Sequence, residues 1–153
     1  AVSFVPSLAA ILGLLVSLAL VQRRTRAAAS RTERWLVAMP FSFYFGWVTV
    51  ATVLNVAVVL TTLGVAGIGG LDDRIVAAAV LLVATAIATT VVLRERDAGY
   101  GLAVVWALNG IYAKETATPY VAEVALLGVA LVGLAAVAMM AARATGRLRV
   151  RTA

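Results

Sequence analysis

The side chains of this chain that could do chemistry are few, and the most distinctive are tryptophans and asparagines placed inside apolar stretches. Trp47 stands eight residues before Asn55, and Trp106 stands three residues before Asn109. An amide in hydrocarbon must find a hydrogen-bond partner and so faces protein or a cavity. An aromatic wall with a few amide groups is typical of a site for a flat, mostly apolar ligand.

The stretch from Met39 to Asn55 places several of these groups on one helical face. At about 100° per residue, Tyr44, Ala51 and Asn55 fall on a narrow stripe with Trp47 beside it. Ala51 is small, so another backbone or a flat ligand could approach there. The alternative is that the asparagines bond across to other helices and the tryptophans pack between helices or at the membrane interface. The candidate ligand-binding residues are Tyr44, Trp47, Ala51, Asn55, Trp106 and Asn109.

Glu123 is the carboxylate that we expect inside an apolar span, in the first turn of the last one. An intramembrane acid is a candidate functional group, for example in proton- or ion-coupled transport. Alternatively, Glu123 complements the helix dipole near a terminus marked by Pro119. The chain has no Cys and no His. Because it also lacks paired carboxylates and an activated nucleophile, we expect no metal site and no enzymatic activity.

The composition indicates a membrane protein. Of the 153 residues, 63% are hydrophobic and only 13% are charged, whereas a soluble domain is about half apolar and a quarter charged. The apolar residues form long runs instead of amphipathic stripes. The net charge of +6 does not indicate nucleic-acid binding, because the cations stand at the ends of the apolar runs, where lipid head groups and membrane topology explain them.

Five apolar segments have the length of a membrane span, which is roughly 17–25 residues. We predict one all-α domain over residues 1–153, a bundle of five transmembrane helices with short loops and antiparallel neighbours. Strands are not expected, because no segment alternates with period two. The predicted spans are residues 3–21, 35–63, 75–93, 98–113 and 120–142.

The arginines give an independent test of five spans. An odd number of crossings puts the first loop, the third loop and the C-terminal tail on one side with eleven Lys or Arg residues, and leaves two on the other. By the positive-inside rule the N-terminus is outside and the C-terminus cytoplasmic. We expect a prokaryotic inner (cytoplasmic) membrane. The eleven are Arg23, Arg24, Arg26, Arg31, Arg34, Arg94, Arg96, Arg143, Arg147, Arg149 and Arg151; the two are Arg74 and Lys114.

Two stretches, "PFSFYFGWVTVATVLNVAVVL" and "GYGLAVVWALNGIY", resemble a divergent branch of the TspO/MBR family, the tryptophan-rich sensory proteins. The resemblance covers roughly residues 35–112. It implies a five-helix bundle that binds porphyrins, sterols or similar flat apolar molecules in an aromatic pocket, as a transporter, sensor or tetrapyrrole-handling protein. The matching residues are Pro40, Phe41, Tyr44, Gly46, Trp47, Val50, Ala51, Asn55, Tyr100, Gly101, Trp106 and Ala107.

The chain departs from the family at its best-known signature, a Pro, Phe and Trp followed by Leu-Tyr in one helix. Here Val-Thr-Val-Ala follows Trp47, and the chain resembles the later part of longer members. With Ala1 in place of an initiator Met, this raises the expectation that an N-terminal portion is absent or encoded apart.

Two functions remain open. The first is a binder or carrier of a flat hydrophobic ligand, such as a tetrapyrrole, a carotenoid or a sterol-like lipid. A non-covalent tetrapyrrole or carotenoid is the candidate cofactor. The second is a non-catalytic accessory subunit of a larger membrane complex. The expected partners are membrane lipids, together with other membrane-protein subunits or a second copy of the chain.

Overall fold

The computed structural model describes residues 4–28, 37–64 and 72–145, with the side chains of the first helix described at residues 6–22 and 24. All regular structure in these ranges is helical, which confirms the all-α prediction. The five helices are α1 (Phe4–Ala28), α3 (Met39–Thr62), α4 (Asp73–Glu95), α5 (Ala98–Lys114) and α6 (Pro119–Ala144).

The helix bounds follow the predicted spans closely, with one clear difference. We expected the first span to end at residue 21, yet α1 continues to Ala28. The added segment is rich in Arg and Ala, which both favour helix, so the helix continues beyond its apolar part. The start of the second predicted span, at residues 35 and 36, lies outside the described residues.

Local sequence explains where the later helices begin and end. Pro40 and Pro119 stand in the first turns of α3 and α6, where a missing N–H costs little. α4 and α5 are joined by only two residues. Arg96 adopts a left-handed conformation with φ of 53°, and the Asp97 side chain then accepts a hydrogen bond from the Tyr100 backbone N–H at 3.1 Å. This cap reverses the chain within a single tight turn.

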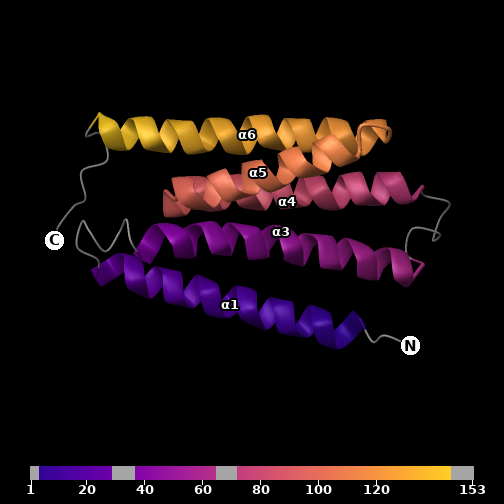
Figure 1. Cartoon of the computed structure of the whole chain (residues 1–153), viewed down its shortest axis with the longest axis horizontal. Helices are drawn as coiled ribbons and strands as arrows, with labels where there is room; N and C mark the ends of the chain where they lie inside the picture. Colours follow the sequence, from indigo (N-terminus) through magenta and orange to yellow (C-terminus); the bar gives the residue numbers. More distant parts are fainter. Residues whose placement is uncertain (1–3, 29–36, 65–71, 146–153) are drawn as a thin grey trace.

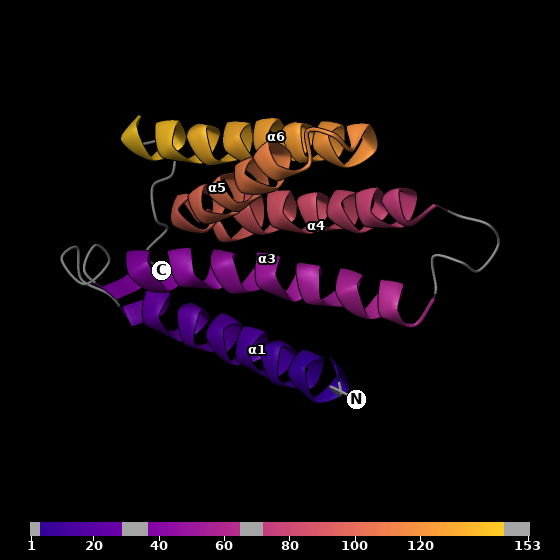
Figure 2. The same cartoon turned by 45° about the vertical axis from the view of Figure 1, so that its right-hand side comes forward.

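Successive helices run in opposite directions (Figure 1). The core lies among α4, α5 and α6, where Val92, Tyr100, Leu108 and Val132 are almost fully buried. α3 covers this core by packing against α5 and, less extensively, α4. Among the described helices, α1 packs only against α3, and both views show it diverging from α3 toward its own beginning (Figures 1 and 2).

Three helices, α3, α4 and α6, are long and apolar enough to cross a membrane. The apolar part of α1 and the whole of α5 each have 17 residues, at the short end of the range for a span. α1 begins and α6 ends at opposite ends of the bundle (Figure 1). One end, the arginine-rich end, carries Arg23, Arg24, Arg26, Arg94, Arg96 and Arg143; Arg31, Arg34, Arg147, Arg149 and Arg151 of the predicted basic face lie outside the described residues.

Candidate functional site

α3 and α5 touch backbone to backbone near the arginine-rich end. A Cβ atom placed on Gly46 would lie 2.7 Å from the Tyr100 carbonyl oxygen and 2.9 Å from the Ala103 Cβ. One turn earlier, a Cβ on Gly99 would lie 3.2 Å from the Ser42 Cβ. Small residues at the interface let the two helix axes approach this closely, as is common between membrane helices.

Beyond this contact the two helices separate. α5 crosses from the side of α4 toward α6 as it approaches Lys114, while α3 slopes the other way (Figures 1 and 2). The separation leaves an open groove of about 380 Å³ between them. We call it the α3–α5 groove. Its lining comprises Trp47, Val50, Ala51 and Leu54 of α3, and Trp106, Ala107, Asn109, Gly110, Ile111, Ala113 and Lys114 of α5.

Two indoles form the aromatic part of the groove. The ring centroids of Trp47 and Trp106 are 5.2 Å apart with an interplanar angle of 32°, and the Phe43 ring lies 6.5 Å from that of Trp106. Trp106 is 60% exposed and Trp47 is 44% exposed. Their faces are therefore available to a ligand or to lipid, and a flat aromatic molecule could stack on them.

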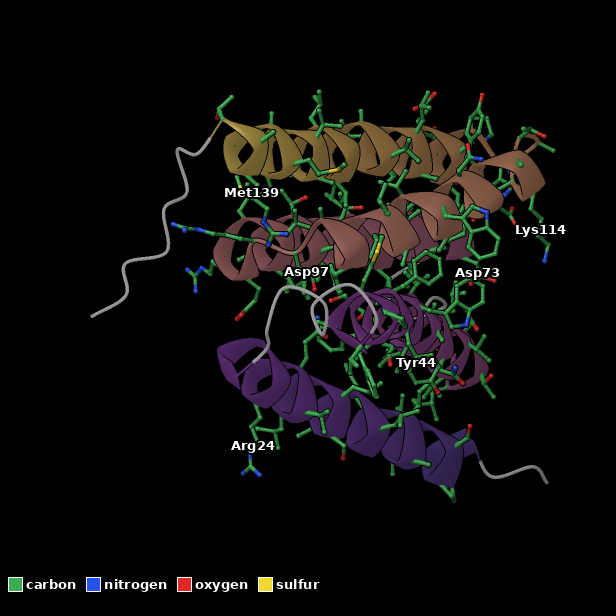
Figure 3. The ribbon with its side chains drawn as sticks, turned by 60° about the vertical axis from the view of Figure 1, so that its left-hand side comes forward. Arg24, Tyr44, Asp73, Asp97, Lys114 and Met139 are labelled. Carbon is green, nitrogen blue, oxygen red and sulfur yellow. The ribbon has the colours of Figure 1, made fainter. Side chains whose placement is uncertain are left out.

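The polar groups of the groove lie toward the end of α5. Asn109 is exposed one turn after Trp106, and Lys114 is the last residue of the helix. Figure 3 shows Lys114 at the opposite end of α5 from Asp97, extending from the ribbon on the side of α3. The groove thus runs from an apolar, indole-lined middle to a polar end that carries a cation.

The structure brings together four of the six predicted ligand-binding residues, Trp47, Ala51, Trp106 and Asn109, in this groove. Tyr44 and Asn55 are not among its lining residues. Tyr44 is exposed on α3 and lies about one turn nearer the arginine-rich end than Trp47. The Asn55 amide nitrogen donates to the Ala51 carbonyl at 2.8 Å, within its own helix, and not to another helix as the packing alternative expected.

Glu123 does not line the groove either. α6 begins at Pro119, so Glu123 lies just after the first turn of the helix, which contains no acidic residue. The sequence had placed Glu123 within that first turn. The side chain is exposed on the surface of the described bundle. Lys114, in contrast, lines the groove and was not predicted from the sequence as a site residue. Its position two turns after Trp106 on the same helix was the available signal.

A second, much smaller cavity lies inside the bundle. It lies between α3, α4 and α5 and has a volume of about 20 Å³, which is room for about one water molecule. The buried hydroxyls of Thr52 and Thr85 donate to carbonyls of their own helices. Within the described ranges, no three acidic side chains gather as a metal site would require.

A buried polar cluster lies at the other end of α5. The Gln22 amide nitrogen of α1 donates to the Ser42 hydroxyl at 2.7 Å and to the Asp97 carboxylate at 2.5 Å. All three side chains are buried. Since Asp97 also caps α5, the cluster ties α1 and α3 to the α4–α5 turn, and Arg143 of α6 donates to the Arg96 carbonyl of the same turn.

The comparison with protein families adds the decisive observation. A family model described as TSPO-like protein matches residues 2–139. The chain belongs to the TSPO-like family. The match confirms the resemblance carried by the segments around Trp47 and Trp106. No curated protein and no solved structure matched the chain.

Family membership and the long apolar helices together identify an integral membrane protein. Membership also indicates a membrane protein that binds hydrophobic ligands. In this TSPO-like chain, the matched region includes every residue of the α3–α5 groove.

Proposed function

We propose that this TSPO-like protein binds or carries a flat hydrophobic molecule, such as a tetrapyrrole, a carotenoid or a sterol-like lipid, in the α3–α5 groove. The observation that carries the proposal is the Trp47–Trp106 pair, with 5.2 Å between ring centroids, exposed on a groove of about 380 Å³. That volume lies within the range of small-molecule sites, about 300–1,000 Å³.

The groove supports binding from within the bilayer. It opens at the side of the bundle, so a ligand dissolved in lipid can enter without crossing the protein. Lipid tails are as apolar as the groove, so burial of apolar surface contributes little. Affinity then depends on stacking against the indoles, which contributes about 0.5–1.5 kcal/mol for each aromatic pair.

Tryptophan fluorescence provides the test. The chain has three tryptophans, so a Trp35→Phe background limits the emission to Trp47 and Trp106. Purified protein in nanodiscs is titrated with protoporphyrin IX. A groove-filling variant, Gly110→Leu, is compared with Gly13→Leu on α1, because a Cβ at either glycine has no neighbour within 4 Å.

We expect quenching that saturates as porphyrin is added, and about a tenfold or greater loss of affinity in Gly110→Leu. Gly13→Leu should bind like the parent, since α1 does not contribute to the groove. Equal affinity in the two leucine variants would place the ligand elsewhere. Quenching that rises without saturation, as in protein-free nanodiscs containing a tryptophan peptide, would contradict ligand binding altogether.

We further propose that the arginine-rich end faces the cytoplasm of a prokaryotic cell and that all five helices cross its inner membrane. The arginines at this end, together with the alternating helix directions, support this orientation by the positive-inside rule. Reporter tags on the two termini should therefore respond in opposite compartments. We also propose a non-catalytic role, because the groove is lined by apolar, indole, amide and ammonium groups, and no carboxylate or hydroxyl among them could act as a general base.

An accessory-subunit role is the second candidate, and the packing of α1 favours it. α1 packs against α3 alone among the described helices, and Val16 and Leu20 are more than half exposed. A neighbouring subunit or a second copy could cover this surface. Co-purification of a stoichiometric partner in mild detergent, lost when both residues are replaced by Ser, would support this role; a monodisperse monomer would contradict it.

A further inference from the structure

The polar end of the α3–α5 groove carries a cation that the stacking of an apolar ring system on the indoles does not require. Lys114 lines the groove together with Trp47 and Trp106. It is exposed, and no ion pair joins it to another described side chain. The nearest acidic neighbour in sequence, Glu115, instead accepts a hydrogen bond from the Thr118 hydroxyl at 3.1 Å.

The groups along the groove follow an order from apolar to charged. The indole of Trp106 comes first, the Asn109 amide lies one turn further along α5, and the Lys114 ammonium lies just over one turn beyond that. A rise of 1.5 Å per residue puts the backbones of Trp106 and Lys114 about 12 Å apart along the helix. Lys114 ends α5, so its flexible side chain can reach the membrane–water boundary while its stem remains on apolar surface.

We propose that Lys114 selects the ligand's head group, so that the groove prefers a flat apolar molecule carrying a carboxylate over its uncharged counterpart. The inference rests on the proposed function, because it concerns the same groove. The ligand body stacks on Trp47 and Trp106, and the carboxylate lies further along α5, where it accepts hydrogen bonds from the ammonium at the end of the flexible Lys114 side chain.

The test uses two probes with the same body. Pyrenebutyric acid and pyrenebutanol differ only in the head group, and both accept energy from tryptophan. Each is titrated into the Trp35→Phe protein in nanodiscs of zwitterionic lipid, with its partitioning into empty nanodiscs subtracted. Lys114→Gln removes the charge, Lys114→Arg keeps it, and Arg74→Gln removes a cation at the same end of the bundle that does not line the groove.

We expect the parent to bind the acid about fivefold more tightly than the alcohol, the preference that a partly exposed ion pair supports. Lys114→Gln should lose this preference through weaker binding of the acid, with the affinity for the alcohol unchanged. Lys114→Arg and Arg74→Gln should retain it. Raising the salt concentration should reduce the preference in the parent and leave Lys114→Gln unaffected.

Equal affinities for acid and alcohol in the parent, or a preference that persists in Lys114→Gln, would overturn the assignment of Lys114 while leaving ligand binding intact. A preference lost equally in Arg74→Gln would also overturn it, since the general charge of this end would then be the cause. Saturable quenching by neither probe would instead refute the proposed function, and this inference with it.

Discussion

The close approach of α3 and α5 at Gly46 is the contact on which the groove depends, and Gly46→Ala tests it directly. The added Cβ would lie 2.7 Å from the Tyr100 carbonyl oxygen, where ordinary contact begins at 3.4 Å. The two helices must therefore move apart by several tenths of an ångström, because the obstructing atom is backbone and cannot rotate away. Overpacking of this kind costs about 1–3 kcal/mol, and the better helix propensity of Ala offsets about 0.5–1 kcal/mol of it.

We expect Gly46→Ala to lower the free energy of unfolding by about 1–2 kcal/mol, measured by far-ultraviolet circular dichroism during titration of mixed micelles with dodecyl sulfate. Gly13→Ala is the matched control, because its Cβ meets nothing within 4 Å and it keeps only the propensity gain. If Gly46→Ala is as stable as Gly13→Ala, the two helices do not touch here, and the origin assigned to the groove is wrong.

Three further predictions concern neighbouring contacts. A Cβ on Gly128 would lie 2.7 Å from the Thr85 hydroxyl oxygen, so Gly128→Ala should destabilise the protein. In a double-mutant cycle of unfolding free energies, Gly128→Ala combined with Thr85→Ala should be at least about 1 kcal/mol more stable than the sum of the two single effects predicts. Simple additivity would contradict this contact. Asp97→Ala removes both the cap of α5 and the hydrogen bond from Gln22, so it should lower the free energy of unfolding by about 2–3 kcal/mol. Asp97→Asn keeps an oxygen for the cap and should lower it clearly less in the same assay. Asn55→Ala should leave porphyrin quenching unchanged, because that amide is bonded within its own helix; a loss of affinity there would place part of the ligand along the Asn55 face.

The sequence determined the class of the protein and the extent of its helices. Long apolar runs bounded by arginine and proline are features of the chain itself, and a helix satisfies its backbone hydrogen bonds locally, so α4 and α6 match their predicted spans within two residues at each end. The sequence also marked Trp47 and Trp106 as candidates, because each lies on an apolar span near small and amide residues, and their ring centroids lie 5.2 Å apart. The extension of α1 to Ala28 was missed because span length was judged by apolarity, whereas Arg and Ala continue a helix outside lipid.

Only the tertiary structure decided which of these residues line one groove. The direction in which a side chain faces depends on where two helices touch, and that point is set here by the missing Cβ of Gly46 against the backbone of Tyr100. From this contact α3 and α5 separate, which opens the groove at Trp47 and Trp106 and brings Lys114 to its end, while Tyr44 and Asn55 lie outside its lining. Helix periodicity predicts which side chains share one face of a single helix. A groove lies between two helices, and the angle at which they cross depends on packing between residues far apart in the chain.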